Sequence, residues 1–505
     1  MPEVKTSKNQ GLGLYASEKY EPGDIILEEL PLFTFHPQNV EQLSSIQSQF
    51  KTSSLKNGVD SSFTKKKDVD AKTDSSVSLD DLNFLDVPST IENCKRSKFK
   101  GLVTAAATYV ISSNISTTTK EKLLSLYSPT ISDDCDESNK YEEGIIKLVS
   151  AAISFLQENT IPSTPLHIFV HENRDECSKI MLIWACNAFK GGHVYEIMSR
   201  VNHSCDFNAI ISLSTSSSKE GDGCDKQCVK ASNVINPGDE IFISYLGTYT
   251  YAGMTLRKKM LSEDKYFDCQ CSRCSNEEFK GDLASCIPCI QCHERLNGRY
   301  LDEDTQYDDD DENKVNYASP RGVGEDVKYF CEKCGDDKSY RLKSSLSTTI
   351  DKTIDRVIDH LDECAGVNVH NNTDETTNEE MAEMTERLLC LSYSVLGSKH
   401  YCTNLLLVQS LAKKLSDIHA SMLCSSVGKN DNKKGSNKDV NKETGLGVDI
   451  TDVAECIDLL ERCFTYTHSL DLNSHVGHLL GSVTIGVARV LVGFGKINYP
   501  ILNHD

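Results

Sequence analysis

The most informative part of this sequence is NHSCDFN at residues 202–208, which is followed by GDEIFISY at residues 238–245 and DCQCSRC at residues 268–274. The first two motifs are predicted to form short strands that end in turns, because Gly, Asn and Asp break their apolar runs. The third has the spacing C-x-C-x2-C, in which three thiolates can face one metal ion. A structural zinc ion takes four ligands, so this group needs one more from elsewhere in the chain. The alternative is a set of structural thiols without a metal.

A second group of cysteines lies on both sides of the acidic run DEDTQYDDDDE, which we interpret as a solvated loop. Cys289 and Cys292 form one C-x2-C pair, and Cys331 and Cys334 form another. Two such pairs across a loop predict a zinc ribbon. Its role would be structural, because four thiolates leave no coordination position open for chemistry. Cys286 is an alternative to Cys289 as a ligand.

Composition and charge narrow the class of protein. The 505 residues are 38% hydrophobic, which suffices for about two to four domains at ~100–200 residues each. A net charge of −22 disfavours direct contact with nucleic acid. It suits a basic protein partner better, because opposite charges steer the encounter of two proteins.

The N-terminal residues and the cysteine content indicate the cellular compartment in which the protein is expected. The first residues, MPEVKTSKNQGLGLY, lack the apolar core of a signal peptide, so we expect a cytoplasmic and/or nuclear protein whose thiols stay reduced. In that setting, 21 cysteines that include clusters indicate metal binding. The most apolar stretch, from His478 to Phe494, contains Arg489 and predicts a buried helix. No membrane contact is therefore expected.

The remaining segments alternate between strand-like, polar and helical patterns. Residues 11–35 predict a strand, a turn at Pro22-Gly23-Asp24 and a second strand. EEGIIKLVSAAISFL at residues 142–156 has apolar residues at helical spacing. From Leu342 onward, amphipathic patterns predict consecutive helices without a clear repeat period.

Taken together and in this order, NHSCDFN, GDEIFISY and DCQCSRC resemble the SET domain of protein-lysine methyltransferases and its post-SET cysteines. GLGLYASEKYEPGDIIL at residues 11–27 resembles the segment that opens that domain. WACNAF at residues 184–189 resembles the Asn-x-Phe element just upstream of the core in the SMYD group. The resemblance covers most of the chain outside the polar insertions. It implies an α+β fold: a β-rich SET domain with a zinc-bound post-SET segment, then an all-α, helical-repeat-like C-terminal domain.

The resemblance, together with the composition, predicts six segments. They are the N-terminal part of the SET domain at 1–37, a polar, disordered insertion at 38–98, a helical insertion at 99–180, the SET core at 181–250, the post-SET and zinc-ribbon region with its acidic loop at 251–341, and the helical C-terminal domain at 342–505.

The resemblance also implies the site residues. Tyr245 matches the tyrosine beside the methyl-transfer channel and is the predicted catalytic residue. The residues predicted to bind S-adenosylmethionine are Gly11, Gly13, Asn187, Asn202, His203, Tyr245 and Phe267. Cys205 matches the missing fourth ligand of the first zinc site. The two predicted zinc sites are Cys205, Cys269, Cys271 and Cys274, and Cys289, Cys292, Cys331 and Cys334.

Some positions depart from the family's pattern. Phe207 stands where proline is common, and Lys265 stands where an aromatic residue can wall the lysine pocket, with Tyr266 adjacent. Gln10 and Leu12 stand where polar or basic cofactor contacts are common. The zinc-binding MYND module of the SMYD group is not expected, because the polar stretch in its place contains one cysteine, Cys94 among residues 38–98.

The function implied is S-adenosylmethionine-dependent N-methylation of lysines in histones or other basic proteins, by a monomer. Tyr245 would orient the target amine, and we do not assign it as the general base, since a water path to bulk is an equal candidate. One alternative is a non-catalytic, zinc-stabilised SET-like scaffold for protein–protein interaction. A third interpretation, a zinc-ribbon protein of transcription, is disfavoured by the acidic charge.

Overall fold

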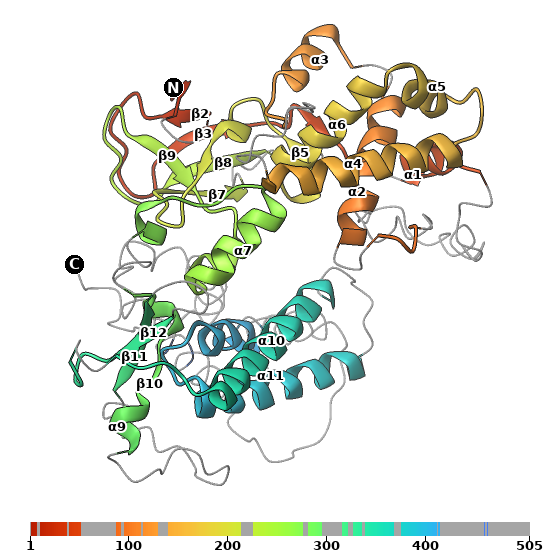
Figure 1. The fold of residues 1–505 in the computed structure, drawn as a ribbon. Coiled ribbons are helices and arrows are strands. Elements are labelled where there is room, and N and C mark those ends of the chain that lie inside the picture. Colours follow the sequence, from red (N-terminus) through yellow and green to blue (C-terminus); the bar gives the residue numbers. More distant parts are fainter. Residues whose placement is uncertain are drawn as a thin grey trace, which may run out of the picture. The chain divides into compact units, whose positions relative to one another are not determined.

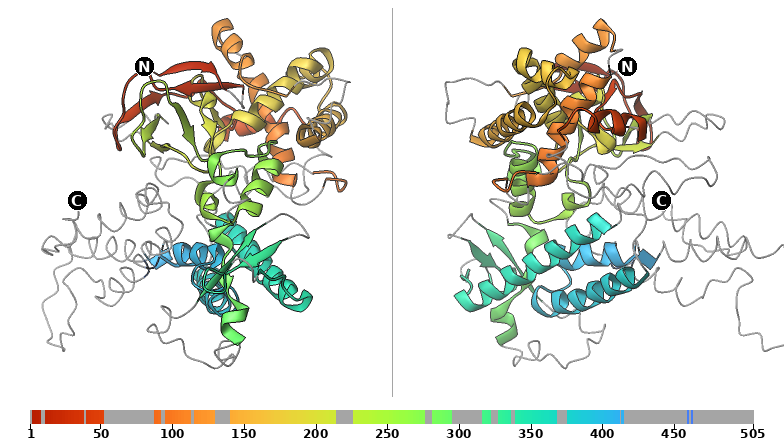
Figure 2. Two further views of the ribbon diagram at one scale, coloured as in Figure 1. Left: turned by 60° about the vertical axis from the view of Figure 1, so that its left-hand side comes forward. Right: turned by 90° about the vertical axis from the view of Figure 1, so that its right-hand side faces the viewer.

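The computed structural model describes most of the chain except several polar segments and the C-terminal region. The described residues are 2–7, 11–37, 40–51, 87–91, 95–112, 115–129, 140–213, 226–275, 281–294, 316–321, 327–335, 339–367, 375–411, 413–414, 459 and 462. They divide into two compact units, Met1–Tyr245 with Lys259–Cys269, and Leu246–Lys258 with Gln270–Asp505. Figures 1 and 2 show the fold from three directions.

The first unit contains the strands that carry the predicted site. Its four-stranded sheet has the order β1-β2-β9-β6, a three-stranded sheet has the order β3-β8-β7, and β4 pairs with β5. The strands are β1 (Glu3–Thr6), β2 (Leu12–Tyr15), β3 (Ile25–Glu29), β4 (Phe33–Thr34), β5 (His193–Val194), β6 (Asn202–His203), β7 (Ala209–Leu213), β8 (Gln227–Ala231) and β9 (Glu240–Ile243). Apolar side chains of these strands form a buried core that includes Leu14, Val229 and Ile241.

The pairing of β6 with β9 is the feature that assembles the site. The two strands are parallel, with Asn202 opposite Phe242 and His203 opposite Ile243. On its other edge β9 pairs with β2, where Leu14 lies opposite Ile241. NHSCDFN, GDEIFISY and the N-terminal GLGLY segment are therefore neighbours in one sheet.

Helices make up the rest of the first unit. They are α1 (Val40–Gln47), α2 (Arg96–Ile111), α3 (Thr117–Leu124), α4 (Lys140–Asn159), α5 (Pro165–Glu172) and α6 (Arg174–Asn187). Figure 1 shows them gathered on one side of the unit, with β2, β3, β7, β8 and β9 on the other. Gly101 of α2 lies against the Trp184 ring of α6, so a side chain there would prevent the two helices from packing this closely. Ser116 begins α3 by accepting a hydrogen bond from the backbone N–H of Thr119 at 3.0 Å.

The predicted polar insertion at 38–98 contains an ordered element. Helix α1 lies within it, and Leu43, Ile46 and Phe50 are buried in the same core as α2, α4 and α6. Residues 52–86 of the insertion lie outside the described residues. The sequence pattern concealed α1 because its apolar positions are separated by Ser and Gln.

The second unit joins a small sheet to long helices. The sheet has the order β10-β11-β12, and Figure 2 shows α10 and α11 side by side. The elements are η8 (Gly247–Tyr251), η9 (Leu283–Ser285), β10 (Ile287–Pro288), α9 (Ile290–Glu294), β11 (Tyr317–Arg321), β12 (Lys328–Phe330), α10 (Ser344–Val367) and α11 (Glu375–Val395). Residues 401–411 form a further helix. Helix α7 (Met254–Asp264) contributes residues to both units.

The predicted α+β class, with a β-rich region followed by helices, is confirmed. None of the described helices is long and apolar enough to cross a bilayer. The apolar stretch from His478 to Phe494 lies outside the described residues.

Candidate active site

An aromatic cluster stands where β6 and β9 end. The ring centroids of His203 and Tyr245 are 5.3 Å apart, and those of His203 and Phe267 are 5.9 Å apart. Tyr245 and Phe267 meet edge to face, with centroids 6.4 Å apart and an interplanar angle of 86°. The structure therefore brings together three of the residues that the sequence predicts for the site, from segments far apart in the chain.

His203 is fully buried and both of its ring nitrogens have partners. Nδ1 accepts a hydrogen bond from the backbone N–H of Tyr245 at 3.0 Å. Because a backbone N–H only donates, Nδ1 carries no hydrogen, and the hydrogen of the neutral ring lies on Nε2. Nε2 lies 3.3 Å from Cys205 Sγ and is placed to donate to that sulfur.

The Tyr245 hydroxyl is held in one direction. It donates to the backbone carbonyl of Val201 at 2.7 Å. The hydroxyl itself is buried although part of the side chain is accessible, and this burial raises the pKa of the phenol well above its usual value. The Cys186 thiol nearby adds to that shift. Tyr245 therefore stays a neutral phenol at physiological pH, which suits an orienting group and disfavours a general base.

Asn202 and Gly13 meet at the carboxylate of Glu240. The Asn202 side-chain amide donates to Glu240 Oε1 at 2.8 Å and to the Leu12 carbonyl at 3.2 Å. A Cβ on Gly13 would collide with the Glu240 carboxylate and come within 2.9 Å of Asn202 Nδ2. Gly11 is required for a different reason: its φ is +74° and the space beside it is open.

Glu240 is a site residue that the sequence did not single out. Its second carboxylate oxygen accepts hydrogen bonds from the hydroxyls of Ser7 at 2.9 Å and Tyr15 at 3.0 Å. This one side chain therefore joins the N-terminal strands to the Asn202 amide. The only signal in the sequence is an acidic residue at the start of the IFIS strand, which by itself is ordinary.

Asn187 ends α6 and is buried. Its side-chain amide donates to the carbonyls of Tyr127 at 2.7 Å and Ile183 at 2.9 Å. These bonds fix the end of the helix. The contact of Asn187 with a cofactor stays a prediction.

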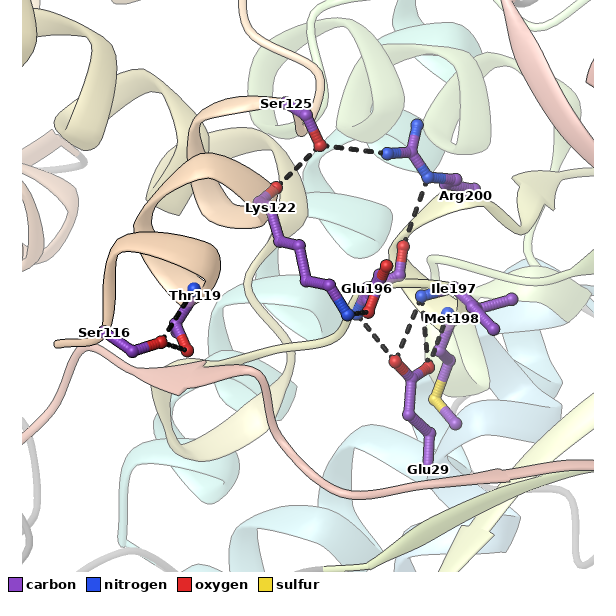
Figure 3. Close-up of polar contacts among 9 residues, drawn as sticks. All are labelled: Glu29, Ser116, Thr119, Lys122, Ser125, Glu196, Ile197, Met198 and Arg200. Atoms are coloured by element: carbon purple, nitrogen blue, oxygen red, sulfur yellow. Dashed lines mark hydrogen bonds and ion pairs between the residues drawn. The ribbon is translucent and has the colours of Figure 1, made fainter.

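The segment that leads into β6 is fixed by a carboxylate of β3 (Figure 3). Glu29 accepts hydrogen bonds from the backbone N–H groups of Glu196 at 2.7 Å, Ile197 at 3.1 Å and Met198 at 2.9 Å. The Glu196 carboxylate forms an ion pair with Lys122 of α3 at 2.7 Å. Three successive donors to one carboxylate fix the backbone that precedes Val201 and Asn202.

The first cysteine group is assembled. One ligand atom from each of Cys205, Cys269, Cys271 and Cys274 lies within 4.8 Å of the others. The sulfur atoms of Cys205 and Cys269 are 3.9 Å apart, and no disulfide joins them. Four thiols at this spacing fit a tetrahedral zinc ion. The predicted fourth ligand, Cys205, lies with the other three.

The second cysteine group is assembled in the same way. One ligand atom from each of Cys289, Cys292, Cys331 and Cys334 lies within 4.8 Å of the others, and all four side chains are largely buried. Cys286 is not a member of this group, and burial raises the pKa of its thiol to about 12. The structure therefore favours Cys289 over Cys286 as the ligand.

The comparisons with known proteins agree with this geometry. The model of the SET domain matches residues 11–246. Over 88 residues the chain is 38% identical to histone-lysine N-methyltransferase ASHR1 of Arabidopsis thaliana, a match that covers 17% of this chain and 16% of that protein. Over 84 residues it is 34% identical to a SET and MYND domain-containing protein of Dictyostelium discoideum, covering 17% of this chain and 22% of that protein. The matched regions are thus less than a quarter of either relative.

The region that matches the SET domain includes Gly11, Gly13, Asn202, His203 and Tyr245. The chain therefore contains a SET domain, which spans residues 11–246, and is similar to a histone-lysine N-methyltransferase and to a SET and MYND domain-containing protein.

Proposed function

We propose that this chain is an S-adenosylmethionine-dependent protein-lysine N-methyltransferase that acts on histones or other basic proteins. The observation that carries the proposal is the cluster of His203, Tyr245 and Phe267 at the ends of the paired strands β6 and β9, which belong to a SET domain. We further propose that it acts as a monomer in the cytoplasm and/or nucleus.

The residues of the first unit fit the cofactor. Phe267 is half-buried and offers aromatic surface suited to the adenine, with the buried ring of His203 packed against it, and Gly11 has open space beside its backbone. The N–H groups of the Asn187 and Asn202 side chains are bonded within the protein, so their side-chain carbonyl oxygens are proposed to accept from the polar parts of the cofactor. When bound, S-adenosylmethionine supplies an electrophilic methyl group on a sulfonium sulfur.

The protein's contribution to methyl transfer is orientation and control of a proton. The target lysine must be neutral to act as a nucleophile, yet its usual pKa is ~10.4. Partly buried, apolar surroundings beside Tyr245 lower the pKa of an entering ammonium. Since the phenol of Tyr245 has a raised pKa, we propose that the proton leaves to water rather than to Tyr245. Alignment of the amine with the methyl group can supply ~7–11 kcal/mol of the barrier.

The two cysteine groups are proposed to hold structural zinc. Cys205 follows Asn202 and His203 on the NHSC turn, while Cys269 follows Phe267. A zinc ion bound by both cysteines would fix these two segments relative to each other. Four thiolate ligands leave no open position, so neither ion takes part in the reaction.

The proposal is tested by incubating the purified, zinc-loaded chain with methyl-labelled S-adenosylmethionine and a panel of histones and other basic proteins. Label on lysine side chains is the expected result. A matched reaction with Tyr245→Phe separates transfer by this site from transfer by a contaminant. If folded protein binds the cofactor but labels no protein, the enzymatic function is wrong.

A non-catalytic SET-like scaffold is the second candidate, and one observation favours it. The ammonium of Lys265 lies over the ring of Tyr245, where an aromatic pocket wall was expected. If this ammonium blocks the site, Lys265→Tyr should create activity that the natural chain lacks. Activity in the natural chain excludes the scaffold.

A further inference from the structure

Lys265 lies at the start of a strained turn that ends α7. Its backbone N–H makes a helical hydrogen bond to Leu261 at 2.9 Å, and the next residue, Tyr266, has a φ of +65°. A large residue with positive φ costs free energy and persists only where the surroundings fix it. Lys98 of α2 supplies that support: its ammonium donates to Asp264 Oδ1 at 3.2 Å and lies 4.8 Å from the Tyr266 ring centroid.

The turn directs Lys265 toward the aromatic cluster. Its Nζ lies 5.6 Å from the Tyr245 ring centroid, within reach of a cation–π interaction. Among the residues that the structure describes, no carboxylate forms an ion pair with this ammonium. Burial lowers the pKa of Lys265, and the positive charge of Lys98 lowers it further, while Cys186 and Asp264 act in the opposite direction.

The groups that act on the amine come from four elements: Lys98 from α2, Cys186 from α6, Asp264 from α7 and Tyr245 from just after β9. A partly buried cation with no partner carboxylate is costly, and a strained turn adds to that cost. An aromatic residue would fill the same place without a charge. This cost indicates that the ammonium of Lys265 has a function in the site.

We propose that Lys265 is a positioning residue that determines specificity, because its fixed ammonium repels the charged form of an entering lysine and admits the neutral amine. This inference rests on the proposed methyltransferase function. An aromatic residue in this place would attract the charged form of the target lysine through its ring face. Lys265 instead makes the site favour the neutral amine.

The physical effect is that of one cation on another. A like charge a few ångströms away disfavours the charged form of an amine and lowers its pKa, by about one to two units in a partly buried site. The fraction of neutral target amine at neutral pH then rises about ten- to a hundredfold. In the transfer itself, the amine nitrogen bonds to the methyl carbon as the carbon–sulfur bond breaks. The sulfur keeps the electron pair, and the methylated ammonium product later loses its proton to water.

The test is the pH dependence of methyl transfer to a lysine peptide from the most strongly labelled protein, using the full, zinc-loaded chain. Lys265→Met removes the charge at similar length, and Lys265→Arg keeps a charge. Lys259→Met is the matched control, because Lys259 is exposed on the same helix and outside the site. Circular dichroism and zinc content show whether each variant is folded.

Removing the cation should raise the pKa of the bound target amine. The acidic limb of the kcat profile, measured with saturating peptide, should therefore move to higher pH by about one unit in Lys265→Met, because kcat reports groups in the enzyme–substrate complex. Activity near pH 7 should fall about tenfold and recover at alkaline pH. Lys265→Arg and Lys259→Met should follow the natural chain.

Two results would overturn the inference while leaving the enzyme intact: coincident pH profiles for Lys265→Met and the natural chain, or a methyl group found on Lys265 by mass spectrometry. The second would make Lys265 an acceptor instead. A different result contradicts the proposed function itself: the natural chain binds the cofactor but methylates no peptide or protein at any pH. The role of Lys265 would then fall together with the methyltransferase function.

Discussion

Nδ1 of His203 accepts a hydrogen bond from the backbone N–H of Tyr245, and Nε2 of the same ring faces Cys205 Sγ. One buried imidazole thus connects a cysteine of the first predicted zinc site to the predicted orienting tyrosine. The ring cannot adopt the other neutral tautomer without losing the bond to Tyr245, since Nδ1 would then carry a hydrogen. A change in the position of the Cys205 sulfur is therefore expected to shift the His203 ring and, through it, the backbone of Tyr245.

His203→Phe tests this connection, because it keeps a ring and removes both polar contacts. The backbone N–H of Tyr245 would lose its partner, which costs ~1–3 kcal/mol of folding stability. We expect faster loss of zinc to a chelator and a reduced rate of methyl transfer. His171→Phe, at an exposed position of α5, is the control. Unchanged zinc retention in His203→Phe would contradict the connection.

Tyr245→Phe should keep the ring packing and lose the hydroxyl. Methyl transfer is expected to fall about ten- to a thousandfold, equivalent to ~1.4–4 kcal/mol of transition-state stabilisation. Zinc content and cofactor affinity should change little, because their proposed contacts lie on other residues. The lost hydrogen bond to Val201 should lower stability by only ~0.5–1.5 kcal/mol. Full activity on the same preparation would assign Tyr245 to packing alone.

Metal analysis should give two zinc ions per chain, one for each cysteine group. Cys205→Ser should remove one ion and weaken cofactor binding, because the NHSC turn loses its link to the post-SET segment. Cys286→Ser is the matched control, since this buried thiol lies outside both groups and its loss should leave the zinc content unchanged. A Cys205→Ser protein that keeps both ions would show that another residue is the fourth ligand.

Gly13→Ala should destabilise the site by ~1–3 kcal/mol, because its methyl group would collide with the Glu240 carboxylate and the Asn202 amide. Cofactor binding should weaken with it. Gly144→Ala is the opposite case: that glycine lies in helix α4 with open space around it, so alanine should be neutral or stabilise by up to ~1 kcal/mol. Calorimetric melting of both variants compares them directly, and equal melting temperatures would contradict the packing around Gly13.

Much of the site could be predicted because its residues lie in motifs whose order in the chain is informative. The assignment of Cys205 to the first cysteine group depended on that order, since no spacing joins it to Cys269. The structure brings the two sulfur atoms to 3.9 Å. Many helices and strands were predictable from local patterns, although α1 was not, and the α+β class was implied by the family resemblance.

Other features could not be predicted because they depend on contacts between distant segments. Glu240 and Glu29 are ordinary acidic residues in sequence, and only the folded structure shows that each carboxylate accepts hydrogen bonds from three donor groups. The Lys98 contact that supports the Tyr266 turn joins residues 165 or more positions apart. Lys265 was recognised as unusual from the sequence, but its position over the Tyr245 ring required the fold.

The central claim is that this SET domain transfers methyl groups to protein lysines. The most direct measurement is mass spectrometry of a histone mixture after incubation with the purified chain and S-adenosylmethionine. The account predicts N-methyl-lysine in the reaction with the natural chain and much less with Tyr245→Phe. Unmodified lysines throughout a broad panel of basic proteins, with a folded chain that binds the cofactor, would contradict it.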